Sequence, residues 1–360
     1  MKLNRLRLTN FKNFDSWHAD FHPQVNALVG ANGRGKTNIL DAIYTLAVGK
    51  SYFSLTNRQL IRHGEDFFSL KGAFEKNDAA FDVLLKYREG ERKILEVNGK
   101  EVTPLSAHIG RIPVVMISPY DRDLIGEGGE IRRRFMDKLI AQYDAAYLAD
   151  LIRYMRTLQQ RNRLLKYFAA NGIFDPGQLD PYDRELAATG QRIYEKRKDF
   201  VDKLRPLLRQ KYRWISGGAE EVDLVYQSAL HQAGARDLLA ANLAKDRVLQ
   251  YTSAGIHRDD LRFLINGYPI RKFGSQGQQK SYLIALRLAE SDLLYAQKND
   301  TPILLFDDIF DKLDPQRVRQ ILTYVKNRIF GQVFLTDTHP ERINQLIETL
   351  DNEAKIFHLT

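Results

Sequence analysis

The chain has 360 residues, of which 44% are hydrophobic and 28% are charged, so we expect a globular protein of one or two domains. The absence of cysteine excludes disulfides, thiol catalysis and a cysteine-based zinc site. A formal net charge of +9 favours an acidic partner, either nucleic acid or an anionic membrane surface. No apolar stretch is long enough to span a bilayer, and we therefore expect a cytoplasmic protein without membrane contacts.

A phosphate-binding loop is the first strong feature along the chain. Residues 3–9 and 17–21 predict strands, and the apolar run 25–29 is typical of a buried strand. The next eight residues fit the pattern Gly-x4-Gly-Lys-Thr, and 38–44 have helical spacing. Strand, glycine loop and helix N-terminus together direct backbone N–H groups at phosphates. The expected ATP-binding residues are Gly30, Ala31, Asn32, Gly33, Arg34, Gly35, Lys36, Thr37 and Asn38.

Further strands and then a helical region follow this loop. Strands are expected at 69–74, 81–87 and 113–118, with an Asn-Gly hairpin over 94–102. From 131 to 213, Arg, Lys, Leu, Tyr and Gln recur at helical spacing, without the sustained heptads of a coiled coil. The basic residues here either track a phosphate backbone or are ordinary solvated helix faces. The candidate DNA contacts are Arg132, Arg133, Arg153, Arg156 and Arg161.

The last third of the chain predicts the other half of a nucleotide site. Strands are expected at 222–226, 261–265, 303–306 and 333–336, and helices at 281–294, 318–328 and 340–350. Asp307 and Asp308 follow the apolar strand 303–306, so they stand at its C-terminal tip. We expect Thr37 and Asp307 to hold Mg²⁺, and Asp308 to orient or deprotonate an attacking water. With Lys36, the two acids form the candidate catalytic set.

A second motif, Ser275-Gln276-Gly277-Gln278, precedes the helix expected at 281–294, which is another anion-binding geometry. The order of phosphate loop, Ser-x-Gly-Gln, paired acids and Leu313-Asp314 resembles the ATP-binding-cassette ATPases, specifically their SMC-like branch. This resemblance implies an α/β ATPase head with a phosphate loop, a mixed sheet and an inserted helical lobe. It also implies that Ser275 and Gly277 contact the γ-phosphate held by a second subunit, and that Asp314 bridges the dimer.

Several longer segments are similar to the RecF family of bacterial recombination mediators, over essentially the whole chain. They are Leu6 to Phe14, Gly30 to Ile43, Leu60 to Arg62, Ser118-Pro119, Arg132 to Asp137 and Gly255 to Leu261. The resemblance implies an ATP-driven homodimer with weak, DNA-dependent ATPase activity that binds single-strand/double-strand junctions and duplex DNA. It implies work in recombinational gap repair, replication restart and the SOS response to DNA damage, with RecR, RecO and RecA as partners.

We expect ATPase lobe I to combine 1–118 with 251–360, and the helical lobe II to span 119–250. Three positions leave alternatives. Phe53 stands where the family often has Arg, and Asp337 stands at the switch position, with His339 as a substitute. His257 to Asp260 form either a functional segment or a structural salt-bridge network. The rival functions are an SMC-like chromosome-structure ATPase, which would need a long heptad insert, and the ATPase subunit of a transporter.

Overall fold

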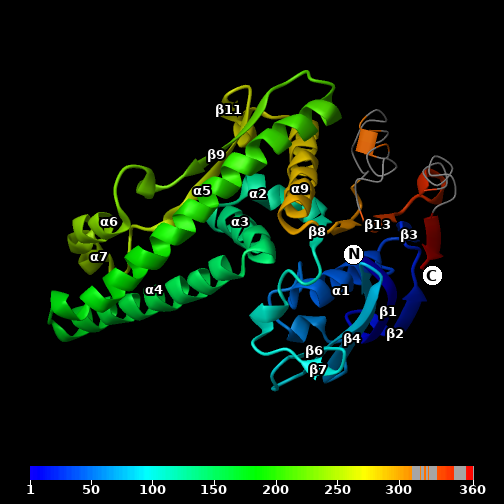
Figure 1. Cartoon of the computed structure of the whole chain (residues 1–360), viewed down its shortest axis with the longest axis horizontal. Helices are drawn as coiled ribbons and strands as arrows, with labels where there is room; N and C mark the ends of the chain where they lie inside the picture. The colour runs from blue at the N-terminus through cyan, green and yellow to red at the C-terminus, as the bar shows by residue number, and fades with distance from the viewer. Residues whose placement is uncertain (310–316, 318–319, 322, 324–330, 344–353, 360) are drawn as a thin grey trace. The chain divides into compact units, whose positions relative to one another are not determined.

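The computed structural model describes residues 1–309, 317, 320–321, 323, 331–343 and 354–359 (Figure 1). The chain divides into two units, and each contains segments that are distant in the sequence. Unit 1 comprises Met1–Asp121, Lys211–Ala219 and Gln276–Thr360. Unit 2 comprises Arg122–Gln210 and Glu220–Ser275.

Unit 1 contains a parallel sheet, which has the order β14-β3-β13-β12-β8 among the described residues. Its strands are β3 (Val25–Val29), β8 (Val114–Ile117), β12 (Ile303–Phe306), β13 (Val333–Asp337) and β14 (Ala354–His358). All residues of β3, β8, β12 and β13 are buried, as in sheets covered on both faces. Because the strands are parallel, the residues that follow β3, β12 and β13 meet at one edge.

An antiparallel sheet of the same unit has the order β2-β1-β4-β5-β6-β7. Its strands are β1 (Lys2–Phe11), β2 (Phe14–Asp20), β4 (Phe67–Lys76), β5 (Ala79–Arg88), β6 (Ile94–Val97) and β7 (Lys100–Glu101). In β1, Leu3, Leu6 and Leu8 are all fully buried, although residues three apart in a regular strand point to opposite faces of the sheet. A shift in the β1–β4 register between Leu3 and Arg5 accounts for this, because a bulge turns the next residue to the other face.

The helix that follows the phosphate loop lies between these two sheets. Helix α1 (Lys36–Val48) contacts β4 and β5 of the antiparallel sheet and β8 and β13 of the parallel one. Its Ile39, Leu40 and Ile43 belong to a single apolar cluster with residues from both sheets. Helix α9 (Gln276–Lys298) packs against β8. The loop and its helix are therefore anchored to the main core of unit 1.

Unit 2 combines helices with a small sheet of order β11-β10-β9 among the described residues. Its helices are α2 (Arg122–Gly126), α3 (Gly129–Tyr143), α4 (Ala145–Asn171), the first part of α5 (Asp180–Ser216), α6 (Ala235–Ala241), α7 (Leu243–Leu249) and α8 (Ile270–Phe273). The sheet contains β9 (Val222–Gln227), β10 (Asp260–Ile265) and β11 (Tyr268–Pro269), paired antiparallel. Helix α3 packs on both β10 and α4.

Ion pairs join α4 to α5 along most of the length of α4. The pairs are Asp144–Lys196, Asp150–Arg192, Arg153–Glu185 and Arg161–Asp183, with N···O distances of 2.5–2.8 Å. The residue numbers rise on one helix as they fall on the other, so the helices are antiparallel. Carboxylates of α5 therefore neutralise two of the α4 cations, Arg153 and Arg161, which the sequence presents in an uncompensated basic run.

The unit boundaries differ from the expected lobes at two places. Strand β10 pairs with the full length of β9, which keeps the chain in unit 2 as far as Ser275 rather than 250. Residues 211–219 belong to unit 1, because Lys211 lies 2.5 Å from Asp292 of α9 and Tyr212 packs near Tyr282. The helical insert is thus interrupted by contacts that sequence periodicity does not reveal.

Most expected elements are present, and the α/β class is confirmed, although parallel and antiparallel strands form separate sheets. Strand β14, which pairs with β3, was not expected from the sequence. Most of the helices expected at 318–328 and 340–350 falls outside the described residues. Within the described part of the chain, none of the helices combines the length and hydropathy needed to cross a membrane.

Candidate nucleotide-binding site and its surroundings

The phosphate loop joins the end of β3 to the start of α1, and two of its glycines are required by close contacts. At Gly30 a Cβ would lie 2.5 Å from the carbonyl oxygen of Leu359. Gly35 has φ +93°, and a Cβ there would lie 2.5 Å from the ring of Phe14. Any side chain would therefore force the loop away from its neighbours, as well as strain the left-handed backbone at Gly35.

Lys36 lies inside this loop. Its ammonium donates to the carbonyl oxygens of Gly30 and Ala31, at 2.5 and 2.9 Å. Burial lowers the pKa of Lys36, and the carboxylates of Asp308 and Asp307 oppose that shift. The ammonium is thus held by two carbonyls of the loop itself, which is where the phosphate-loop pattern expects a lysine that binds nucleotide phosphates.

Three oxygen-bearing side chains meet beside Lys36, although they come from distant parts of the chain. The Thr37 hydroxyl donates to Asp307 Oδ1 at 2.7 Å, and the Thr336 hydroxyl donates to the same oxygen at 3.0 Å. Asp307 is 4% exposed, and burial raises the pKa of its carboxyl while the two hydroxyl bonds oppose the rise. The parallel sheet creates this arrangement, because β12 and β13 end beside the start of α1. Sequence analysis missed Thr336, whose only signal is its place near the end of an apolar strand.

Asp308 and Asp337 complete this edge of the sheet. The Asp308 amide donates to Thr336 Oγ1 at 2.9 Å, and its φ of +46° turns the chain just after β12. Asp337 is fully buried and accepts from the His339 amide at 2.8 Å and from Arg342 Nη1 at 3.0 Å. The His339 imidazole is 63% exposed and bonds to Thr338. At the switch position, therefore, the buried carboxylate rather than the imidazole is the group near Lys36.

The oxygen donors at this site fit a magnesium ion bound with a nucleotide. Mg²⁺ prefers hard oxygen ligands and is usually held by one or two protein groups together with phosphates and waters. Thr37 and Asp307 supply such a pair, 2.7 Å apart. Among the described residues, no group of three or more His, Asp or Glu side chains is arranged to hold a metal ion by itself.

The Ser275-Gln276-Gly277-Gln278 segment leads into α9, whose first residue is Gln276. Ser281 donates its hydroxyl to the Gly277 carbonyl oxygen at 2.9 Å, within the first turns. These residues thus stand at the N-terminus of a long, largely buried helix, where backbone N–H groups attract anions. Asp314, the expected dimer-bridging residue, lies outside the described residues.

A buried charged cluster in unit 1 ties α9 to the chain after α1. Arg287 of α9 donates to Asp121 at 2.6 Å, to Glu290 at 2.6 Å and to the Tyr52 hydroxyl at 2.8 Å. Tyr52 is fixed in turn by Asp41 of α1, which accepts from its amide at 2.8 Å. The sequence signal for this cluster is a charged pair, three residues apart, inside an apolar helix.

Phe53, where the sequence resemblance led us to expect an Arg, takes part in an aromatic group. Its ring packs against Tyr52 and Tyr120, and the Lys12 ammonium lies 5.5 Å from its centre. Lys12 also forms a 2.6 Å ion pair with buried Asp41. The cation near this position is therefore supplied by Lys12, from the turn between β1 and β2.

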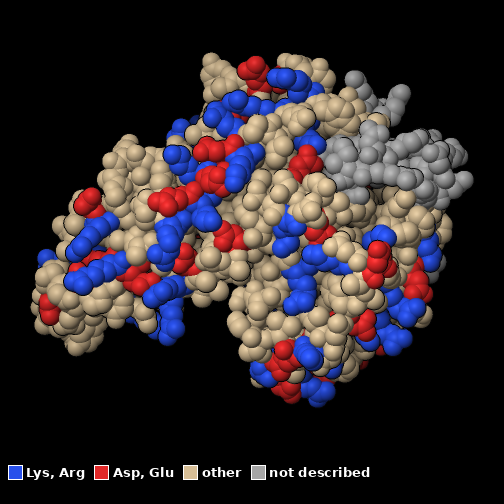
Figure 2. Space-filling view, in the orientation of Figure 1, with Lys and Arg blue, Asp and Glu red and all other residues tan. Residues whose placement is uncertain are grey.

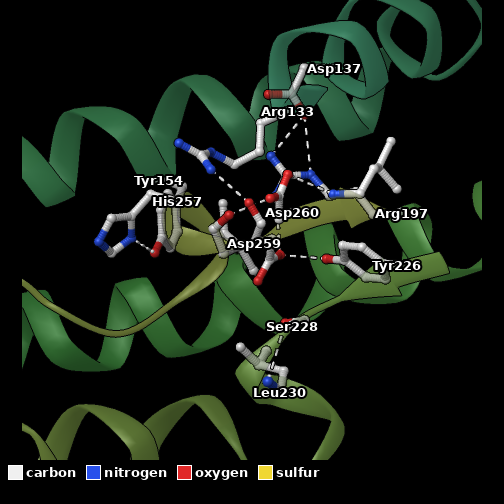
Figure 3. Close-up of polar contacts among 12 residues, drawn as sticks. Arg133, Asp137, Tyr154, Arg197, Tyr226, Ser228, Leu230, His257, Asp259 and Asp260 are labelled. Atoms are coloured by element: carbon white, nitrogen blue, oxygen red, sulfur yellow. Dashed lines mark hydrogen bonds and ion pairs between the residues drawn. The ribbon is translucent and has the colours of Figure 1, made fainter. Parts of the chain in front are cut away.

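Residues 257–260 form a structural network within unit 2 (Figure 3). Buried Arg197 of α5 donates to Asp137 at 2.8 Å and to Asp259 at 3.2 Å. The Arg133 guanidinium donates to the Asp259 carbonyl oxygen at 2.6 Å. Arg132 forms a bidentate pair with Asp260, at 2.6 and 2.9 Å. The segment thus joins α3, α5 and the start of β10. Of the two alternatives that the sequence left open, the structure favours the structural salt-bridge network.

His257 is held neutral in the same network. Its Nε2–H donates to the Thr252 carbonyl oxygen at 3.0 Å, so Nδ1 accepts from the Tyr154 hydroxyl at 2.8 Å. Burial lowers the pKa of His257 to about 4. Gly255 permits this contact, because a Cβ there would lie 2.5 Å from the Tyr154 hydroxyl oxygen.

Two of the five candidate DNA contacts, Arg132 and Arg161, are wrong, because their guanidinium groups form hydrogen bonds and ion pairs inside unit 2. Arg161 is fully buried and donates to Asp183, Asp246 and Thr252. Arg132 is 13% exposed and, besides Asp260, donates to two backbone carbonyls. A phosphate could reach neither without breaking these bonds.

The other three candidates differ in how available they are. Arg133 is half-buried and Arg153 pairs with Glu185, whereas Arg156 is exposed. On the same helix, Arg163 and Lys166 are also exposed, and no described carboxylate forms an ion pair with any of the three. On the face shown in Figure 2, acidic and basic residues of this unit are interspersed rather than segregated.

The fold and the site define the ATP-binding head shared by RecF, RecN and SMC proteins. The family model described as "RecF/RecN/SMC N terminal domain" matches residues 2–358. The head of an Smc protein bound to the C-terminal winged-helix domain of ScpA has the same fold, with TM-score 0.58 and 16% identity over 99% of this chain and 94% of that one.

The chain belongs to the RecF family. It is 50% identical to the DNA replication and repair protein RecF of Flavobacterium johnsoniae, with 100% of both chains covered. It is 41% identical to RecF of Parabacteroides distasonis, over 100% of this chain and 97% of the relative. Among solved structures, the recombination mediator protein RecF-ATP of the RecFOR pathway aligns with TM-score 0.87 and 30% identity, covering 94% of this chain and 92% of that one.

Proposed function

We propose that this chain binds and hydrolyses ATP in DNA replication and repair, and that ATP acts as the switch of a DNA-binding homodimer in the cytoplasm. The observation that carries the proposal is the contact between Thr37 and Asp307 beside Lys36. It brings the phosphate loop and the paired acids, 270 residues apart, to one point. The name of the F. johnsoniae relative and the nucleotide bound by the solved RecF support the same reading.

We propose the following roles for the residues at the site. Lys36 binds the outer phosphates, while Thr37 and Asp307 hold Mg²⁺, which neutralises phosphate charge when it is bound. Asp308 orients a water for attack on the γ-phosphorus and accepts its proton as the bond to the β-phosphate oxygen breaks. Burial raises the pKa of Asp307 and so disfavours its ionised form. A divalent cation bound beside the carboxylate would have the opposite effect and favour ionisation.

In this proposal ATP completes its site only in a dimer. Ser275 and Gly277 of one chain contact the γ-phosphate bound by the other, with Gln276 and Gln278 in the same segment and Asp314 at the dimer contact. Isolated chains would then hydrolyse ATP slowly. DNA, at single-strand/double-strand junctions or in duplexes, would stimulate turnover by stabilising the closed dimer.

The dimer is tested by sizing in the presence of ATP. Ser275→Arg should abolish the ATP-dependent dimer while nucleotide affinity stays within about twofold, because the residue acts on the partner's nucleotide. Ser16→Arg, on an exposed edge of β2, is the matched control and should dimerise normally. A Ser275→Arg chain that dimerises like the control would refute the trans role. Asp308→Asn should trap the ATP dimer if hydrolysis opens it.

DNA binding is tested on gapped, single-stranded and duplex DNA, each with ATP, ADP or no nucleotide. We propose the exposed α4 cations Arg156, Arg163 and Lys166 as phosphate contacts, and charge reversal of each should weaken binding and reduce its salt dependence. Arg7→Glu, at an exposed position of β1, is the control. Equal affinity in all nine conditions would contradict the ATP switch. Addition of RecR, RecO and RecA to the same assay tests the proposed pathway partners.

A further inference from the structure

A hollow of about 750 Å³ lies in unit 1, away from the phosphate loop. Its walls come from the β4–β5 turn, the end of β6, the segment before β8 and the last residue of α9. Lys298 precedes β12 and Arg111 precedes β8, so the hollow lies near the N-terminal ends of these parallel strands. The phosphate loop follows the C-terminal end of β3, at the opposite edge of the sheet.

The walls of the hollow carry excess positive charge. Lys76, Arg111 and Lys298 line it, and no Asp or Glu is among the lining residues. Lys76 pairs at 2.9 Å with Asp300, which is almost fully buried and also binds the N-terminal amino group. Within the described residues, no carboxylate forms an ion pair with Arg111 or Lys298. Burial and the charge of Lys76 lower the pKa of Lys298, the nearby Asp300 carboxylate opposes this shift, and a bound anion would oppose it further.

The remaining wall is largely apolar. Phe81, Val97 and Ile109 are half-buried there, accompanied by small alanines. Phe81 already stacks on Phe74, with ring centres 5.6 Å apart, so one face of its ring is covered. Nucleic-acid bases bind chiefly by stacking on open aromatic or guanidinium planes. An aliphatic wall suits a single apolar side chain better, because such a pocket excludes water around one anchor.

We propose that this hollow binds an acidic segment of a protein partner, with one apolar side chain against Val97 and Ile109 and its carboxylates beside Arg111 and Lys298. The volume falls within the roughly 300–1,000 Å³ of typical ligand sites. Binding here is compatible with ATP in the phosphate loop, since the two sites lie at opposite edges of the sheet. The interaction is therefore separable from nucleotide binding and from the dimer proposed above.

The test uses a fluorescent Asp- and Glu-rich peptide with a single Phe, titrated with the full chain by anisotropy. Arg111→Glu and Lys298→Glu should each weaken binding by about tenfold, which corresponds to about 1.4 kcal/mol. Arg7→Glu, an equal change of charge elsewhere in unit 1, should alter it less than about twofold. Replacing the peptide's Phe with Ser should also weaken binding. Lys36→Ala should bind the peptide normally while losing ATP, which separates this result from the proposed function.

Each other result decides against the proposal. Equal peptide affinity in the wild type and both charge reversals would place binding elsewhere. Failure of the peptide to bind, with single-stranded DNA affinity lost on Arg111→Glu, would make the hollow a nucleic-acid site. ATP binding by each variant reports whether it folds. If a charge reversal fails this check, the milder variant Arg111→Gln or Lys298→Gln replaces it. Each of these is expected to weaken peptide binding about threefold.

Discussion

Replacing Arg161 with Ala should destabilise unit 2 without removing a DNA contact. The side chain is fully buried, and its Nη1 donates to Asp246 at 2.7 Å and to Thr252 at 2.9 Å. Asp246 is itself fully buried, so Ala leaves a carboxylate without its counter-ion. Asp183 loses its guanidinium partner as well, although it is partly exposed.

The size of the effect follows from these contacts. Removing one partner of a buried ion pair destabilises a protein by about 3–5 kcal/mol, since the remaining charge is uncompensated. For a domain of this size, each kcal/mol lowers the Tm by about 2–4 °C, so the transition should fall by about 6–20 °C. Arg156→Ala, on the exposed face of the same helix, should change stability by less than about 0.5 kcal/mol.

Calorimetry of both variants, followed by DNA titration below the lower Tm, separates the two roles. Arg161→Ala should lose stability and keep its DNA affinity, whereas Arg156→Ala should keep its stability and lose affinity. The double variant Arg161→Met/Asp246→Asn should recover at least about 1 kcal/mol, because it removes the unpaired charge. An Arg161→Ala chain with wild-type Tm and weakened DNA binding would refute the assignment of this residue to the interior.

Asp307→Asn should increase the free energy of unfolding at pH 7 by about 0.5–2 kcal/mol, measured as a higher Tm, while abolishing Mg²⁺-dependent hydrolysis. Because burial raises the pKa of Asp307, its ionised carboxylate destabilises the folded state. The Tm difference between Asp307→Asn and the wild type should therefore shrink as the pH falls toward 4. A difference that is independent of pH would contradict this reasoning. Burial lowers the pKa of His257 to about 4. Neutral His257 therefore contributes about 3 kcal/mol to the free energy of unfolding above pH 6.5, and this contribution is lost as the pH falls toward 4. His257→Gln should flatten that part of the Tm–pH profile, and an unchanged slope would assign it to other groups. Gly35→Ala should reduce ATP affinity at least about tenfold in calorimetric titration, since the new Cβ meets Phe14, and wild-type affinity would show that the loop can relax.

Much of the nucleotide site could be predicted because its chemistry is encoded in short, fixed spacings. The loop from Gly30 to Thr37 sits between β3 and α1, as the strand–loop–helix pattern requires. Asp307 follows a strand of four apolar residues, and parallel strands bring such tips to a common edge. Local composition therefore sufficed for the fold class, the phosphate loop and the placement of the paired acids.

The environment of each charge was decided only by tertiary structure. Along α4 the sequence shows Arg161 among other cations, but its carboxylate partners come from α5 and α7, and they convert it into a buried structural residue. Thr336 and β14 likewise take their roles from pairing with distant strands. Periodicity reports which face of an element is apolar, whereas long-range ion pairs depend on which elements pack together. The sequence alone therefore predicted the ATP-binding loop and the paired acids of this protein, because short motifs encode them. Packing decided which arginines of the described chain are buried in ion pairs and which are exposed.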